Sequence, residues 1–434
     1  MTIGRSECGV QYAVRRSSSA VGYCALSIRC GTRDEAGYEN GMRDRNGYHS
    51  GIAHFVEHTL FKGTAKRKAS AISSCLDRLG GELNAYTTKE EIVIHATVLK
   101  EDLHKAASLL FELVTCPVFP EDEVATEKGV VIDEINSYKD SPSEEVYDRF
   151  EELLFEGHPL SGPILGTVAS VKKIGRAELV RFVREKFRPE NMAFTVVADI
   201  PEDRMERSVN RLVTRYFGGS GTGSSDSPAF ADRSGRIPGG HCQLRSCGVK
   251  AHHFDIVQNR RNHQVNCVIG AAAPSLYDDN RLAAVLLSNM LGGPASNSIL
   301  NSILREKNGW VYGVECSYTQ YSDTGIMAIC LGCDRENLDK CLKAIDREID
   351  RLKSAPVSGR RLQAAKKQLL GQLAISGDNG ETQCLSMGKS LLSYGRILTQ
   401  EESRDLIEAV TPAQLQDVAC SVFGSGRLSR LIFT

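Results

Sequence analysis

The chain has 434 residues, of which 41% are hydrophobic and 25% are charged, enough to bury two or more separate cores. Its 53 basic and 54 acidic residues leave a formal net charge of −1 without a basic stripe, so we expect no nucleic-acid partner. No apolar run approaches the ~18 residues that a membrane-spanning helix needs, so we expect no membrane partner.

The N-terminal segment and the cysteines indicate the compartment. The first twenty residues place charges around only a short apolar patch, which is not the pattern of a secretory signal. The fourteen cysteines lack the regular spacing of a disulfide framework. Cys330 and Cys333 form a lone C-x-x-C pair in an apolar segment, where reduced thiols are expected. These features predict a cytoplasmic protein.

A polar insertion precedes the first chemically informative segment. The turn Gly31–Glu35 is followed by residues 38–50, which are rich in polar residues and contain two glycines. Such a composition predicts a loop.

The next segment contains the string H-x-x-E-H, formed by His54, Glu57 and His58. On a helix these three positions share one face, so both imidazoles and the carboxylate point to the same spot. Two neutral histidines can hold a divalent cation, and the glutamate can accept a proton from a water molecule that the metal polarises. A motif this short also arises by chance. However, apolar residues in the same segment draw the helix towards a core, and half-buried histidines without a partner would be costly.

A third zinc ligand is expected further along the chain, because a catalytic site needs three protein ligands and one open position. A helix predicted from about residue 121 to residue 138 contains Glu127 and Glu134, which lie two turns apart on one face. Either can ligate while the other supports it. Asp133 lies about 100° around the helix from Glu134 and is the weaker candidate. Taken alone, this pattern is more typical of a solvated acidic face, and only the need for a third ligand favours the metal-binding interpretation.

The second half of the chain repeats the pattern of the first. A strand-like segment at 91–98 followed by a helical one at 103–114 has its counterpart in residues 325–331 and 338–352. A Gly/Ser-rich composition begins at Gly218 and is typical of a flexible linker. We therefore predict three parts: a zinc-binding domain (1–217), a linker (218–240) and a homologous domain (241–434).

The second domain is not expected to bind the metal. Residues 279–290, which correspond to the H-x-x-E-H helix, contain no histidine. Residues 361–374, which correspond to the acidic helix, contain no glutamate.

Together these motifs resemble the pitrilysin and mitochondrial processing peptidase family of inverted-motif zinc peptidases. Glu134 follows His58 by 76 positions, and the resemblance continues through Phe61-Lys62-Gly63-Thr64, Asn84-Ala85-Tyr86-Thr87, His158-Pro159-Leu160 and Gly166-Thr167. It implies that His54, His58 and Glu134 bind one zinc ion per chain. It also implies that Glu57 is the general base and that Glu127 is an outer-sphere helper.

Two further segments carry roles implied by the same resemblance. Residues 304–312 are similar to the family's C-terminal signature, in which Arg305 and Tyr312 would hold the substrate carbonyl. A cation and a phenol suit that role, because negative charge develops on the carbonyl oxygen during attack. Asn84, Ala85 and Tyr86 resemble the edge strand onto which the family adds a peptide as an extra strand.

We therefore expect an α+β fold of two homologous domains, each a mostly antiparallel sheet with packed helices, closing like a clamshell around the zinc. The expected function is a zinc-dependent endopeptidase that cleaves unfolded or presequence-like peptides in an enclosed cavity. The competing hypothesis is a non-catalytic or partner-dependent subunit of a processing-peptidase-like complex. Because one chain carries both the zinc motif and the Arg305 and Tyr312 pair, we expect no different partner chain, and a homodimer by two-fold symmetry.

Overall fold

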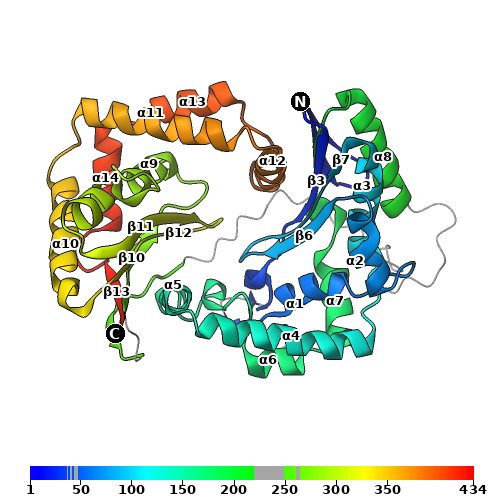
Figure 1. The fold of residues 1–434 in the computed structure, drawn as a ribbon, viewed down its shortest axis with the longest axis horizontal. Helices are drawn as coiled ribbons and strands as arrows, with labels where there is room; N and C mark the ends of the chain where they lie inside the picture. Colours follow the sequence, from blue (N-terminus) through cyan, green and yellow to red (C-terminus); the bar gives the residue numbers. More distant parts are fainter. Residues whose placement is uncertain (37, 40–41, 44–46, 219–248, 261–263) are drawn as a thin grey trace. The chain divides into compact units, whose positions relative to one another are not determined.

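The structure is a computed structural model that describes the chain except for residues 37, 40–41, 44–46, 219–248 and 261–263 (Figure 1). The predicted linker lies outside the described residues apart from Gly218. The described residues form two compact units. The first comprises Met1–Ile135, the described part of Gly162–Gly239, and Ile375–Leu398; the second comprises Asn136–Ser161, the described part of Gly240–Ala374, and Thr399–Thr434.

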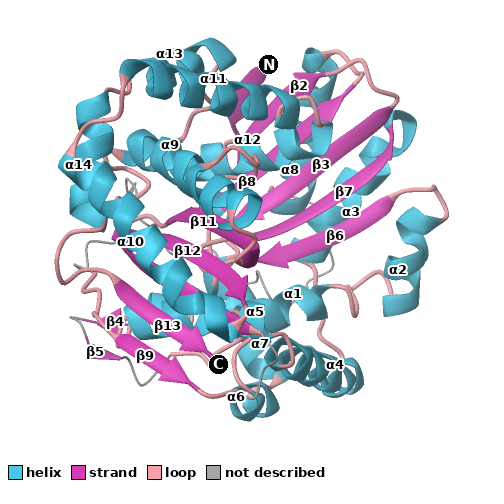
Figure 2. Cartoon of the chain, turned by 60° about the vertical axis from the view of Figure 1, so that its left-hand side comes forward, coloured by secondary structure: helices cyan, strands magenta, loops and turns pink. Residues whose placement is uncertain are grey.

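A six-stranded sheet organises the first unit. Its strands, in spatial order, are β1 (Thr2–Arg5), β2 (Gln11–Arg16), β8 (Met192–Ala198), β3 (Val21–Ile28), β7 (Ile92–Leu99) and β6 (Glu82–Thr87). Only β2 and β8 run parallel; the other neighbours are antiparallel. Figure 2 shows β6 at one edge, beyond β7. All seven residues of β8 are buried, as expected for a central strand covered on both faces.

The second unit contains a five-stranded sheet. Its spatial order is β11 (Val311–Gln320), β12 (Gly325–Cys333), β10 (Val265–Ala273), β13 (Ser429–Phe433) and β9 (Asp255–Gln258). Only β13 and β9 run parallel. When β1 is set aside, this order and these directions match those of the first sheet strand for strand. The predicted duplication and the mostly antiparallel α+β architecture are therefore confirmed.

The helices of the first half include the three that the sequence predicts, around residues 54–58, 103–114 and 121–138. They are α1 (Ile52–Leu60), α2 (Ala69–Asp77), α3 (Leu103–Thr115), α4 (Glu121–Lys139), α5 (Pro142–Leu154), α6 (Val168–Lys173), α7 (Arg176–Lys186) and α8 (Glu202–Phe217). The polar insertion contributes two short strands, β4 (Tyr38–Glu39) and β5 (Met42–Arg43), while the rest of residues 37–46 lies outside the described residues. Short 3-10 turns occupy Thr32–Asp34, Lys100–Asp102, Pro159–Ser161 and Pro189–Asn191.

The helices of the second half repeat this order up to α7, and the described residues include no counterpart of α8. They are α9 (Arg281–Gly292), the π-helical segment η5 (Asn301–Lys307), α10 (Leu338–Ser354), α11 (Gly359–Ser376), α12 (Gly380–Tyr394), α13 (Gln400–Glu408) and α14 (Pro412–Val422). A 3-10 turn at Arg335–Asn337 precedes α10. No helix in the described part of the chain is long and apolar enough to cross a bilayer.

One helix from each half packs on the sheet of the other half. Helix α5 contacts β10 and β13, and α12 contacts β8, β3 and β2. Gly388 allows the close approach of α12, since a Cβ there would lie 2.5 Å from the Oγ of Ser27. The compact units therefore do not follow a single division at the linker: residues 136–161 and 375–398 each belong to the unit built mainly from the opposite half.

Candidate metal centre

The helix that carries the H-x-x-E-H string is fixed at its N-terminus by a buried carboxylate. Glu35 is 4% exposed, and its two oxygens accept hydrogen bonds from the backbone N–H groups of Gly51 (2.9 Å) and Ala53 (3.0 Å). Gly51 has a φ of 88°, and a Cβ there would lie 2.7 Å from the carbonyl oxygen of Leu165, so only glycine fits. The apolar face of α1 is buried in the core of the first unit, at Ile52, Phe55, Val56 and Leu60.

The opposite side of α1 brings the expected ligands together with α4. The Nε2 atoms of His54 and His58 lie 3.7 Å and 3.4 Å from the same oxygen, Oε2 of Glu134. One ligand atom from each of the three residues can be chosen so that all lie within 4.8 Å of one another.

This arrangement fits a zinc ion. Tetrahedral zinc with bonds of about 2.0–2.1 Å places neighbouring ligand atoms about 3.3 Å apart, close to the two observed separations. Burial, together with the neighbouring His58, lowers the pKa of His54 to about 3, so this imidazole is neutral and able to ligate. Glu134 is 41% exposed, which leaves the metal position open to solvent on one side.

A second carboxylate orients one of the histidines. The Oε1 atom of Glu127 lies 2.9 Å from Nδ1 of His58, and its Oε2 lies 2.6 Å from Nζ of Lys62. A buried carboxylate in this position selects the tautomer in which Nδ1 carries the proton and Nε2 is free to bind a metal. The geometry therefore places Glu134 among the ligand atoms and Glu127 behind His58.

The remaining residue of the motif does not join the ligand set. The Oε2 atom of Glu57 accepts a hydrogen bond of 2.5 Å from the hydroxyl of Thr87, the last residue of β6. Burial raises the pKa of Glu57, while the Thr87 hydrogen bond and His58 act in the opposite direction. A partly desolvated carboxylate beside a metal position is suited to accept a proton.

The predicted substrate strand lies at the edge of the first sheet. Among the described residues, β6 pairs only with β7, so the backbone on its other side is free to pair with an added strand. Ala85 faces the main core of the first unit, whereas Tyr86 packs with the cluster under α12 and lies edge-on to His95. Asn84 shares the face of Tyr86, because side chains alternate along a strand.

The other two predicted site residues belong to the second unit. Arg305 is exposed on η5, and Tyr312 is 57% exposed at the start of β11, where its hydroxyl donates to Oδ1 of Asp334 at 2.9 Å. Their predicted role at the metal centre stays a prediction.

The C-x-x-C pair does not form a second metal site. Cys330 and Cys333 are three positions apart on β12, so their side chains point to opposite faces of the sheet. They accordingly pack in two different apolar clusters.

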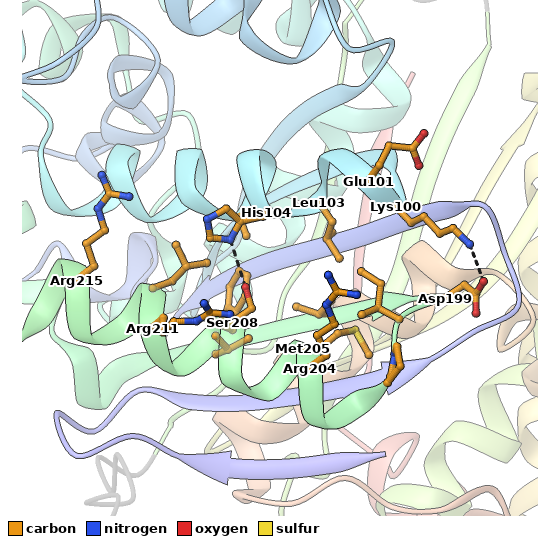
Figure 3. A pocket seen from close by; sticks show the side chains of 17 residues that line it. Lys100, Glu101, Leu103, His104, Asp199, Arg204, Met205, Ser208, Arg211 and Arg215 are labelled. Carbon is orange, nitrogen blue, oxygen red and sulfur yellow. Dashed lines mark hydrogen bonds and ion pairs between the residues drawn. The ribbon is translucent and has the colours of Figure 1, made fainter.

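A cavity of about 680 Å³ lies elsewhere in the first unit, between α3 and α8 (Figure 3). Its rim includes the ion pair of Lys100 with Asp199 (2.7 Å) and the contact of His104 Nδ1 with Ser208 Oγ (3.2 Å). None of the predicted site residues lines it. The candidate metal centre therefore lies outside this cavity.

Sequence reasoning missed three supporting residues, namely Glu35, Lys62 and Thr87. Lys62 and Thr87 lie inside segments that carry the family resemblance, and Glu35 is the last residue of the turn Gly31–Glu35. Their partners are 16, 65 and 30 positions away in the chain, so no local spacing rule links them.

Comparison with known proteins identifies the family of the chain. The family profile described as "Insulinase (Peptidase family M16)" matches residues 12–168, and the one described as "Peptidase M16 inactive domain" matches residues 173–369. The chain belongs to peptidase family M16. This pitrilysin-like family is the one that the motifs indicated.

Several curated M16 relatives span most of the chain. An uncharacterized zinc protease of Streptomyces coelicolor is 28% identical over 387 residues, covering 88% of this chain and 81% of its own. An uncharacterized zinc protease of Bacillus subtilis is 26% identical over 388 residues, covering 88% of each chain.

Two solved structures share the two-domain fold. A protease from Helicobacter pylori superposes with a TM-score of 0.84 at 19% identity, covering 100% of this chain and 99% of that one. A peptidase M16 inactive domain from Pseudomonas fluorescens gives 0.81 at 18% identity, covering 100% and 97%. These similarities show that the chain has the same two-domain fold as the two solved structures.

Proposed function

We propose that this M16 chain is a zinc-dependent endopeptidase that hydrolyses unfolded peptides. The observation that carries the proposal is the convergence of His54, His58 and Glu134 at tetrahedral spacing, with Glu57 beside them but outside the ligand set. The naming of the curated relatives as zinc proteases supports peptidase activity in general.

Each residue then has a chemical task. Zinc, when bound by the three ligands, would supply the Lewis acid that activates water and polarises the scissile carbonyl. Glu57 accepts a proton and afterwards donates it to the leaving amine. Glu127 and Lys62 hold His58 in the tautomer that presents Nε2.

The substrate preference follows from the edge strand. A peptide that adds to β6 pairs through its own backbone N–H and C=O groups, so it must be extended and free of other secondary structure. Unfolded or presequence-like oligopeptides meet this requirement, whereas compact proteins do not. We place Asn84, Ala85 and Tyr86 in contact with the substrate.

Two further parts of the proposal concern the second unit and the assembly. We assign Arg305 and Tyr312 to the substrate carbonyl, because a guanidinium and a phenol both donate hydrogen bonds to developing negative charge. We also propose that the protein is cytoplasmic and that two chains form a homodimer. Light scattering of the purified protein would measure the dimer directly.

The deciding experiment combines zinc analysis with hydrolysis of a quenched fluorescent peptide. We expect one zinc per chain and zinc-dependent cleavage by the wild-type protein. Glu57→Gln should keep the zinc and lose turnover by orders of magnitude, because an amide cannot accept the proton. Wild-type turnover by this variant would exclude Glu57 as the base.

The second candidate is a non-catalytic or partner-dependent subunit. It is favoured by the match of residues 173–369 to a profile described as an inactive domain and by the absence of histidine from α9. The same assay separates the two functions. A zinc-loaded chain that cleaves nothing until a second protein is added would support the subunit.

A further inference from the structure

We propose that Thr87 is a positioning residue that holds the general base, Glu57, in a fixed relation to the substrate-binding edge strand. This inference rests on the proposed peptidase function. It assigns to the last residue of β6 a task that neither the zinc motif nor the family match describes.

The position of Thr87 follows from the pleat of the strand. Side chains alternate along β6, so Leu83, Ala85 and Thr87 share one face. Leu83 and Ala85 pack on the core of the first unit, which includes the apolar side of α1, and α1 and β6 are in contact. Thr87 therefore points towards α1 at the level of Glu57, and the two side chains meet through a hydrogen bond of 2.5 Å.

Glu57 needs such a partner. Its side chain has several rotatable bonds, and holding a glutamate in one rotamer costs up to ~2 kcal/mol. Within the described residues, the Thr87 hydroxyl is the one hydrogen-bond donor to this carboxylate, and it donates to Oε2. The bond restrains the carboxylate and, within the described residues, leaves Oε1 without a hydrogen bond, so Oε1 is the oxygen available to accept the proton. A reacting group that is misplaced by about 1 Å can lower the rate by about a hundredfold.

The contact also couples binding to chemistry. A peptide paired with β6 takes its position from the backbone of that strand. Thr87 belongs to the same strand and is hydrogen-bonded to Glu57, so both the scissile bond and the base are positioned relative to β6. The hydroxyl should accordingly affect kcat, since the backbone of β6 that pairs with the peptide is unchanged when it is removed.

The kinetic test compares three variants of the zinc-loaded full-length chain. Thr87→Val replaces the hydroxyl with a methyl group of similar size and should lower kcat at least tenfold, with KM within twofold and the zinc content unchanged. Thr87→Ser restores a hydroxyl and should retain kcat within threefold of wild type. The matched control is Thr97→Val, the same replacement on the paired strand β7, where Thr97 lies opposite Glu82. It should behave as wild type.

A second readout needs neither zinc nor activity. In metal-free protein labelled with ¹³C at the glutamate carboxyls, the Glu57 resonance is assigned by its loss in Glu57→Gln. We expect this resonance to move in Thr87→Val and to stay in place in Thr97→Val. If the wild-type chain cleaves no peptide, the proposed function fails while this measurement still tests the contact.

Three outcomes would overturn the proposal. One is a wild-type kcat in Thr87→Val, and another is an unmoved Glu57 resonance in that variant. The third is loss of zinc or of the fold in Thr87→Val, because Thr87 would then be a structural residue.

Discussion

Replacing Glu35 with alanine should loosen the helix that carries the zinc motif. The carboxylate is buried and accepts hydrogen bonds from the N–H groups of Gly51 and Ala53, at the start of α1. Alanine would leave both donors buried without an acceptor, at a cost of about 1–3 kcal/mol each. We therefore expect Glu35→Ala to lower the free energy of opening the first turn of α1 by about 2–6 kcal/mol. Glu35→Gln keeps one acceptor oxygen and should show about half of this effect.

Hydrogen exchange followed by mass spectrometry is the suitable assay. Trp310, the single tryptophan, lies in the second unit, so its fluorescence does not report on α1. A destabilisation of about 2 kcal/mol corresponds to roughly thirtyfold faster exchange, so the peptide covering residues 50–60 should exchange at least that much faster in Glu35→Ala. Zinc affinity should fall as well, because His54 directly follows the freed Ala53.

A cap on another helix provides the control. Thr399 caps α13, in the second unit, because its side-chain oxygen accepts a hydrogen bond from the backbone N–H of Glu402, and Thr399→Ala should cost about 1 kcal/mol locally. It should leave exchange in the 50–60 peptide unchanged. Unaltered exchange of that peptide in Glu35→Ala, with zinc affinity intact, would refute the role of Glu35 as the anchor of α1.

The same carboxylate should give a pH dependence of defined sign. Burial raises the pKa of Glu35 to about 8 from its usual 4.5, although the two backbone N–H groups and Lys89 act in the opposite direction. The folded state then binds this proton more tightly than the unfolded state, so the stability it contributes is complete below pH 4.5 and is lost as the pH rises towards 8. The Tm advantage of wild type over Glu35→Gln should therefore shrink across this range. An advantage that grows with pH would contradict the sign.

The remaining predictions concern the metal and the substrate carbonyl. Metal analysis should show that Glu134→Gln loses most of its zinc, whereas Glu127→Gln should weaken zinc binding about 10–100-fold. The reverse result would make Glu127 the ligand and Glu134 the supporting residue. Lys62→Met removes the cation beside the buried Glu127 and should weaken zinc binding on the order of tenfold in a chelator competition, while Lys62→Arg should restore it. Arg305→Ala and Tyr312→Phe should keep zinc and lower kcat/KM more than tenfold, a loss above ~1.4 kcal/mol, and unchanged kinetics in both would remove the second unit from the reaction.

Local spacing is sufficient to predict the elements that carry the chemistry. Because a helix repeats every 3.6 residues, spacing alone places the string from His54 to His58 on one face, and the same rule pairs Glu127 with Glu134. The duplication is also predictable, since the strand and helix patterns recur in both halves. These inferences depend only on residues close to one another in the chain.

Tertiary structure decided what spacing left open. Helical periodicity places Glu127 and Glu134 on the same face of the helix and does not tell which of them binds the metal. The packing of α4 against α1 sets Glu134 opposite the Nε2 atoms of both histidines and sets Glu127 against Nδ1 of His58. The partners of Glu35 and Thr87 lie on other elements, so their contacts appear only after folding.

The sequence also does not predict that α5 belongs to the second unit and α12 to the first. An amphipathic helix encodes an apolar face, but it does not encode which sheet will cover that face. Both sheets derive from the same strand pattern and offer similar apolar surfaces. The pairing was therefore settled by the three-dimensional path of the chain, which no local pattern in the sequence records.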